Sequence, residues 1–201
     1  SWAVIRIALK QKPDLFIGTG ADVAHAGWLL RKPCITTLED DVDIISNLAR
    51  MTYPFTRDIL VPRPCKVGKW ERKKIGYAGY MKLAYLHPNL FTPDEEVVKR
   101  YGIDSKYIII RAVKLTAYHD IHVKGLNLKL IDQIISMATQ LGYRVCINAE
   151  CQLPAAYQTY LLPINPSDMH HLMSYASLLI SDSQSMSVEA ALLGTPNLRF
   201  S

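Results

Sequence analysis

The sequence predicts an α/β protein with two parallel sheets, and two observations carry this prediction. Short, almost entirely apolar segments alternate with helix-like segments along most of the 201 residues. Strands of this kind are typical of parallel sheets that are covered by helices on both faces. The alternation occurs twice and is interrupted by an aromatic stretch around Pro88 and Pro93. We therefore expect two Rossmann-like domains, residues 1–92 and 93–201.

The first domain opens inside an amphipathic helix, which we expect to follow an earlier strand. Since the chain also lacks an initial Met, we expect it to be a fragment. Apolar runs and helical periodicity then predict the following elements. The strands are 14–18, 34–38, 58–61 and 74–78, and the helices are 21–31 and 42–55.

The second domain begins with a short helix after Pro93. Its pattern predicts strands at 107–111, 144–148, 160–162 and 178–180, and helices at 126–141, 168–176 and from near Ser185 to Gly194. A fifth strand ends directly before Ser201, so we expect that a C-terminal helix covering this sheet is missing.

The composition, 49% hydrophobic and 20% charged residues, provides enough apolar surface for a core. No apolar run is long enough to cross a bilayer, and the first residues do not form a signal peptide, so we expect a cytoplasmic protein. The cysteines lack CxxC spacing, which favours reduced thiols without disulfides or zinc. They are Cys34, Cys65, Cys146 and Cys151.

A basic cluster accounts for much of the net charge of +5. It is either a solvated loop or a patch for an anionic membrane surface or a charged acceptor, which would make the protein peripheral to the inner face of the membrane. No nucleic-acid-binding motif accompanies it, so we expect no nucleic-acid partner. The cluster consists of Lys66, Lys69, Arg72, Lys73 and Lys74 around Trp70.

A polar turn, Ser181-Asp182-Ser183, separates the strand at 178–180 from the last helix. Free N–H groups and the positive dipole end of such a helix bind phosphate, assisted by the hydroxyls of Ser183 and Ser185. Glu189 lies one turn beyond Ser185 and would reach a pair of sugar hydroxyls. The alternative is that these residues only cap the helix and offset its dipole.

The segment SDSQSMSVEAALLGTPNLR resembles the nucleotide-sugar segment of the GT-B superfamily. Together with RAVKLTAYHDIHVKGL and YAGYMKLAYLHPNLFTPD, it resembles a prokaryotic family catalogued as domain of unknown function 354, placed beside the GT-B glycosyltransferases and the non-hydrolysing UDP-N-acetylglucosamine 2-epimerases. The resemblance implies a GT-B-like fold that binds a nucleotide-sugar, such as a UDP-sugar, between two domains. Ser183 and Ser185 would contact the diphosphate and Glu189 the ribose, without a resident cofactor.

The long loop 112–125 follows the first strand of the second domain, where α/β sheets bind ligands. Lys124-Gly125 resembles the Lys-Gly that GT-B transferases place against the donor diphosphate, a role that Arg111 or Lys114 would share. Alternatively, Lys124 is solvated and Gly125 only allows the loop to turn.

The same loop carries His119, Asp120 and His122. Two imidazoles and a carboxylate form a familiar metal-ligand set, but no further partner has matching spacing, so we expect no metal. We favour His119 or Asp120 as a general acid/base or a donor contact. His170 and His171 are expected to be surface or capping residues.

Carboxylates follow the strand 34–38 at Glu39, Asp40, Asp41 and Asp43. One interpretation is that Asp41 caps the next helix. The other is that Glu39 or Asp40 is a catalytic base. The 2-epimerases carry a Glu after the equivalent strand, but the Ala-Gly-Leu-Arg that follows it in those enzymes is absent here.

These features lead us to expect a metal-independent glycosyltransferase of surface polysaccharide or glycolipid synthesis. Its partners would be a nucleotide-sugar donor and a lipid-linked or saccharide acceptor at the membrane surface. The alternatives are a 2-epimerase-like enzyme and a non-catalytic nucleotide-sugar-binding module. The sequence does not specify the oligomeric state.

Overall fold

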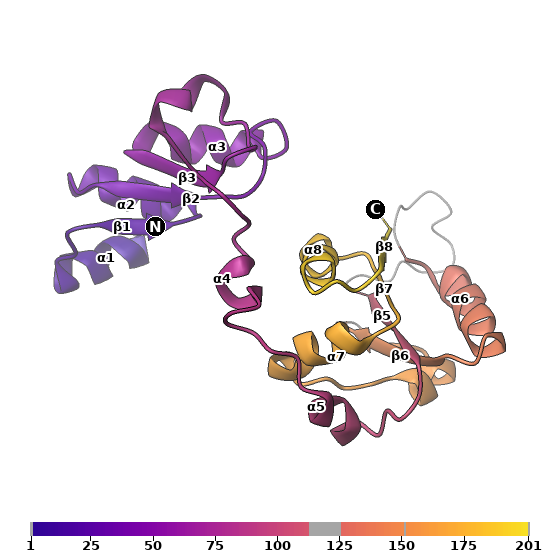
Figure 1. The fold of residues 1–201 in the computed structure, drawn as a ribbon. Helices are drawn as coiled ribbons and strands as arrows, with labels where there is room; N and C mark the ends of the chain where they lie inside the picture. Colours follow the sequence, from indigo (N-terminus) through magenta and orange to yellow (C-terminus); the bar gives the residue numbers. More distant parts are fainter. Residues whose placement is uncertain (1, 113–125, 151, 201) are drawn as a thin grey trace. The chain divides into compact units, whose positions relative to one another are not determined.

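The computed structural model describes residues 2–112, 126–150 and 152–200, which form two compact units (Figure 1). The first unit is Ser1–Ala84 and the second is Tyr85–Ser201. The predicted domain boundary between residues 92 and 93 falls inside the second unit and stays a prediction. None of the helices in the described ranges is long and apolar enough to span a membrane.

The first unit contains a four-stranded parallel sheet in the order β1-β2-β3-β4. Small residues of α2 allow this helix to approach the sheet closely: a Cβ at Gly27 would lie 3.1 Å from Cβ of Cys34. The strands are β1 (Phe16–Gly18), β2 (Cys34–Thr37), β3 (Asp58–Pro62) and β4 (Lys74–Tyr77). The helices are α1 (Trp2–Gln11), α2 (Ala21–Leu29) and α3 (Ser46–Thr52), with short 3₁₀ turns at Tyr53–Phe55 and Gly68–Lys73.

The prediction of a helix over 42–55 is wrong at its start, because α3 begins only at Ser46. The preceding residues form turns in which the Val42 N–H donates to the carbonyl of Lys66. Asp41 does not cap α3. Its carboxylate accepts the backbone N–H of Lys66 at 2.8 Å instead, which connects the loop after β2 to the loop after β3.

The second unit contains another four-stranded parallel sheet, in the order β6-β5-β7-β8. The strands are β5 (Tyr107–Ala112), β6 (Arg144–Ala149), β7 (Leu178–Ser181) and β8 (Asn197–Arg199). The helices are α4 (Leu83–Leu86), which begins in the first unit, α5 (Glu95–Arg100), α6 (Leu128–Gln140), α7 (Met169–Tyr175) and α8 (Gln184–Leu192).

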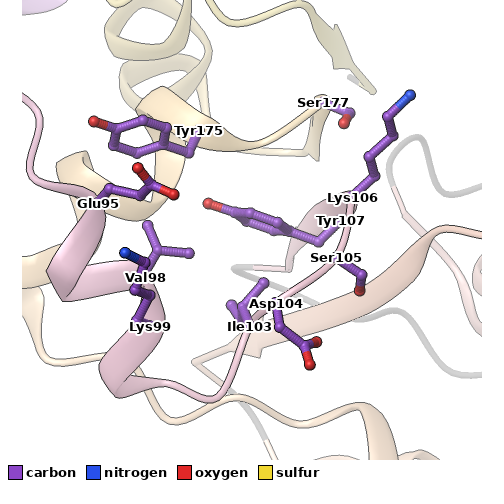
Figure 2. A pocket seen from close by; sticks show the side chains of 10 residues that line it. All are labelled: Glu95, Val98, Lys99, Ile103, Asp104, Ser105, Lys106, Tyr107, Tyr175 and Ser177. Atoms are coloured by element: carbon purple, nitrogen blue, oxygen red, sulfur yellow. The ribbon is translucent and has the colours of Figure 1, made fainter.

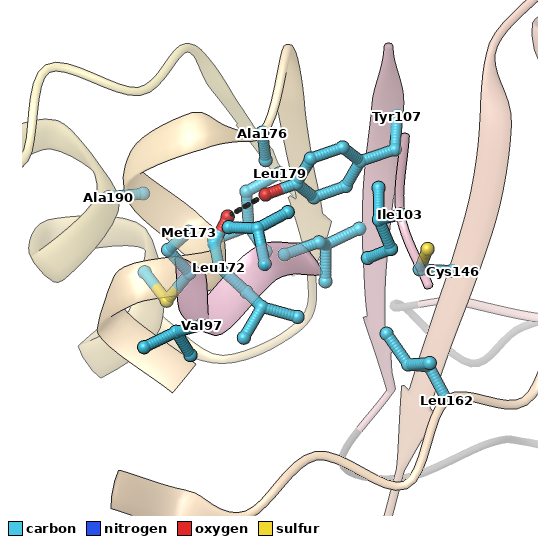
Figure 3. Close-up of a cluster of buried hydrophobic side chains, with 12 residues drawn as sticks. Val97, Ile103, Tyr107, Cys146, Leu162, Leu172, Met173, Ala176, Leu179 and Ala190 are labelled. Carbon is cyan, nitrogen blue, oxygen red and sulfur yellow. Dashed lines mark hydrogen bonds between the residues drawn. The ribbon is translucent and has the colours of Figure 1, made fainter. Parts of the chain in front are cut away.

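Helices cover both faces of this second sheet, as predicted. Successive strand residues point to opposite faces. Tyr107 and Ile109 accordingly pack in one cluster with α5, α7 and α8 (Figure 3), whereas Ile108 and Ile110 pack with α6 in another. The hydroxyl of Tyr107 donates to the buried carbonyl of Leu172 at 2.6 Å, which fastens α7 to the sheet.

The predicted strand at 160–162 is wrong. Residues Ala155–Tyr160 form a 3₁₀ helix, and only Leu161 makes an isolated bridge, to Ile147. The apolar residues that suggested a strand serve the core instead, since Leu162 is buried. β8 is therefore the fourth strand of this sheet and not the fifth.

Candidate functional site

Three polar side chains lie at the carboxyl ends of adjacent strands in the second sheet. Arg111 of β5 is in register with Asn148 of β6 and with Ser181 of β7. Helix α8 begins just after β7, so its N-terminus lies at the same edge. Ligands of parallel α/β sheets bind at such carboxyl edges.

The turn before α8 is a helix cap. The Ser183 hydroxyl accepts the Met186 N–H at 3.4 Å, and the Ser183 N–H donates to Oγ of Ser181 at 2.9 Å. Ser185, in the first turn, is exposed. Another face of α8, with Met186, Ala190 and Leu193, packs on the core. The capping interpretation of Ser183 thus has direct geometric support, while Ser185 is accessible to a ligand.

Glu189 lies one turn beyond Ser185, and both oxygens of its carboxylate have partners. Its Oε2 is 3.1 Å from Nε2 of His170, and its Oε1 accepts the hydroxyl of Tyr85 at 2.9 Å. Only 13% of its side-chain surface is exposed. The carboxylate is therefore held in place from two sides.

Aromatic rings surround the Glu189 partners. The ring of His170 lies 5.7 Å from that of Tyr85 and 6.1 Å from that of Phe91. Nδ1 of His171 accepts the Asp94 N–H at 3.0 Å. The prediction of surface or capping roles for these histidines is incomplete, since His170 contacts the candidate ribose carboxylate.

Arg111 is already paired in the structure. Its guanidinium donates to Asn148 and Glu150, and only 16% of its side-chain surface is exposed. Its Nε is buried and has no hydrogen-bond partner within the described ranges. A contact between Arg111 and a diphosphate stays a prediction. Lys114, His119, Asp120, His122, Lys124 and Gly125 lie outside the described residues.

In the first unit, Glu39 and Asp40 follow the carboxyl end of β2, as predicted. The Glu39 carboxylate forms an ion pair with Lys82, a partner that the sequence analysis missed. Asp40 makes no hydrogen bond or ion pair with any residue that the structure describes. Of the two candidate bases, Asp40 is thus the one whose carboxylate is available to accept a proton.

Neutral phenol and thiol groups lie near these carboxylates. Burial, followed by the charge of Glu39, raises the pKa of Tyr77. Burial, Asp41 and Asp40 raise the pKa of Cys65. The hydroxyls of Tyr53 and Tyr77 are buried without a hydrogen-bond partner in the described part of the chain. The raised pKa values mean that the Tyr77 phenol and the Cys65 thiol retain their protons at neutral pH.

The basic cluster around Trp70 is partly structural. Nζ of Lys73 donates to the carbonyls of Tyr53, Pro54 and Thr56, and burial lowers the pKa of this lysine. Lys69 lies over the Trp70 ring, 4.8 Å from its centroid. Lys73 is therefore unsuited to bind an external anion.

A cavity of about 510 Å³ lies at the other end of the second sheet, at the amino ends of β5 and β7 (Figure 2). It is lined by side chains that include Lys99, Lys106, Tyr107 and Tyr175. Because this end is opposite to Arg111 and Ser181, the cavity lies outside the candidate site.

No group of three His, Cys, Asp or Glu side chains within the described ranges could hold a metal ion.

The sequence matches no protein-family model and no curated protein. The resemblance to domain of unknown function 354 therefore stays a prediction.

Solved structures nevertheless match the fold. UDP-GlcNAc 2-epimerase from Neisseria meningitidis bound to UDP-GlcNAc has a TM-score of 0.66 and 16% identity, over 98% of this chain and 62% of that chain. The Methanocaldococcus jannaschii UDP-GlcNAc 2-epimerase gives 0.65 and 14%, over 97% and 63%. A putative UDP-N-acetylglucosamine 2-epimerase from Listeria monocytogenes gives 0.67 and 11%, over 98% and 59%.

The chain thus spans about three fifths of the length of the proteins that it matches. At these identities the likeness concerns the fold. The predicted fold class, a GT-B-like α/β protein with two Rossmann-like units and parallel sheets, is confirmed.

Proposed function

We propose that the chain binds the nucleotide part of a UDP-sugar at the carboxyl edge of the second sheet. The observation that carries the proposal is the position of Glu189, a largely buried carboxylate one helical turn beyond the exposed first turn of α8. A carboxylate accepts two hydroxyls of a ribose, and a helix N-terminus favours the negative charge of a diphosphate. The solved structure with UDP-GlcNAc on a protein of the same fold supports the proposal.

In this proposal, the diphosphate lies against the first turn of α8. The N–H groups of Gln184 and Ser185 have no acceptor within the helix and would bind phosphate oxygens. The Ser185 hydroxyl adds a donor, while Ser183 shapes the turn as the cap. The positive charge of Arg111 is neutralised by Glu150. We therefore assign to Lys124, beside Gly125, the positive charge that would stabilise the diphosphate.

We propose glycosyl transfer as the reaction, with a lipid-linked or saccharide acceptor in surface polysaccharide or glycolipid synthesis. Asp40 is the preferred base, because Lys82 occupies Glu39. Asp40 would take the proton of the acceptor hydroxyl. The acceptor oxygen would then bond to the anomeric carbon of the sugar while the bond from that carbon to the diphosphate breaks. His119 and Asp120 remain candidates for a second acid/base group.

The experiment that tests binding is isothermal titration of the full chain with UDP, GDP, CMP and their sugar conjugates in buffer with EDTA. We expect micromolar binding of UDP without metal, lost in Glu189→Ala. Glu95→Ala, an exposed carboxylate at the opposite end of the same sheet, is the matched control and should bind normally. Absence of binding by the unaltered chain would contradict the proposal.

The fold neighbours favour an epimerase as the second candidate function. The two reactions differ in their products. An epimerase inverts C2 of a UDP-sugar without an acceptor, whereas a transferase releases UDP only as the sugar passes to an acceptor. Product analysis with and without an acceptor lipid or saccharide separates them, and a binding module would give neither product.

A further inference from the structure

The two oxygens of the Glu189 carboxylate have partners of different kinds. Oε2 is 3.1 Å from Nε2 of His170, an imidazole on α7. Oε1 accepts the hydroxyl of Tyr85, which belongs to the four-residue helix α4. One oxygen thus contacts a ring nitrogen and the other a hydroxyl.

The two partners also differ in how firmly they are held. The side chain of His170 is 25% exposed, and its ring packs against Phe91 and Tyr85. Helix α7, which carries His170, packs into one of the buried core clusters of the second unit through Leu172 and Met173. Tyr85, in contrast, is exposed and lies on a single helical turn. Tyr85 is therefore the partner that can leave at lower cost.

We propose that His170 is a positioning residue that fixes the Glu189 carboxylate for the ribose, and that the Tyr85 hydroxyl occupies Oε1 where a ribose hydroxyl binds. This inference rests on the proposed function and extends it. A phenol and a ribose hydroxyl donate the same kind of O–H···O⁻ hydrogen bond, and the ribose offers two hydroxyls where Tyr85 offers one, so the exchange adds one bond to the carboxylate. The His170 contact persists and keeps the carboxylate from rotating.

The test uses the full chain and titrates UDP and 2′,3′-dideoxy-UDP, which lacks both ribose hydroxyls. We expect the unaltered chain to prefer UDP by at least about tenfold, the value of one hydrogen bond to a charged group. His170→Phe keeps an aromatic ring but loses the nitrogen. It should weaken UDP binding roughly tenfold and leave dideoxy-UDP binding unchanged. His170→Gln restores an N–H donor and should bind UDP within about threefold of the unaltered chain.

Tyr85→Phe tests the exchange separately. Without the competing hydroxyl, UDP should bind about three- to tenfold more tightly, because no hydrogen bond has to be broken first. Thermal unfolding of each variant checks that the fold is intact.

The outcomes separate this inference from the proposed function. Failure of the unaltered chain to bind UDP overturns both. UDP binding that is lost in Glu189→Ala but unchanged in His170→Phe overturns the role of His170 alone. Unchanged or weaker UDP binding by Tyr85→Phe overturns the exchange.

Discussion

Lys82 forms an ion pair with Glu39 in which the lysine side chain is 9% exposed and the glutamate side chain 29%. Three residues further along, Tyr85 bonds to Glu189 of the second unit. The short segment that joins the two units thus contributes one side chain to each candidate site.

Removal of Lys82 should destabilise the first unit. Lys82→Met leaves the Glu39 carboxylate without its cation, and breaking a buried pair costs about 3–5 kcal/mol. Since Glu39 is partly exposed, we expect a smaller loss of about 1–3 kcal/mol in the free energy of unfolding, measured by urea denaturation.

The matched control for this prediction is the double variant Glu39→Gln/Lys82→Met. It removes both charges and should recover part of the lost stability. A Lys82→Met variant as stable as the unaltered chain would show that the pair contributes nothing.

Substitutions at Ser183 should distinguish its role as a helix cap from a role in phosphate binding. Ser183→Ala removes the cap and should cost about 0.5–1 kcal/mol. Ser183→Asp restores a capping carboxylate and therefore the stability, but its charge repels a diphosphate and should weaken UDP binding at least about tenfold. Thermal unfolding and UDP titration of both variants provide the comparison. Normal UDP binding by Ser183→Asp would place the diphosphate elsewhere.

Asp40 should matter for turnover and not for nucleotide binding. Asp40→Asn is expected to lower the rate of transfer at least about 100-fold, the usual contribution of a general base, with UDP affinity unchanged. Asp43→Asn, in the same loop, is the control and should retain activity. Full activity of Asp40→Asn would move the base to another residue, such as Glu39 or Asp120.

Because of Tyr107, the stability of the second unit should vary with pH in the alkaline range. Burial raises the pKa of this phenol, while the unfolded chain loses the proton near the ordinary value of about 10. Unfolding therefore releases a proton above about pH 10, and the free energy of unfolding falls as pH rises further. The contribution of Tyr107 is fully present below that pH.

Tyr107→Phe checks this sign. It should cost about 1 kcal/mol at neutral pH, through loss of the bond to Leu172, and make the alkaline decline less steep. Urea denaturation between about pH 8 and pH 11 measures both effects. An identical pH dependence in the variant would contradict the account.

Much of the fold was predictable because local patterns determine it. Runs such as Tyr107–Ala112 are long and apolar, and each forms a strand of a helix-covered parallel sheet. The run at 160–162 does not form a strand, because Tyr160 ends a 3₁₀ helix, Leu161 makes an isolated bridge and Leu162 packs in a core cluster. The prediction that Asp41 caps a helix is wrong because its carboxylate accepts a hydrogen bond from the backbone N–H of Lys66, which is distant in sequence.

The candidate site was predictable only in part. The turn before α8 and the placement of Glu189 follow from local spacing. The partners of the carboxylates do not, since Lys82 is 43 residues from Glu39 and Tyr85 is 104 residues from Glu189. Such pairs form only when the chain folds, and no local periodicity indicates them. The sequence feature that could have indicated these partners was the aromatic stretch that contains Tyr85.

A crystal structure of the full chain with UDP would test the proposed binding site directly. We expect the diphosphate at the N-terminus of α8 and the ribose hydroxyls on Oε1 of Glu189, with Tyr85 displaced and His170 still on Oε2. UDP bound elsewhere, for example in the cavity lined by Lys99 and Lys106, with the contact between Tyr85 and Glu189 intact, would contradict it.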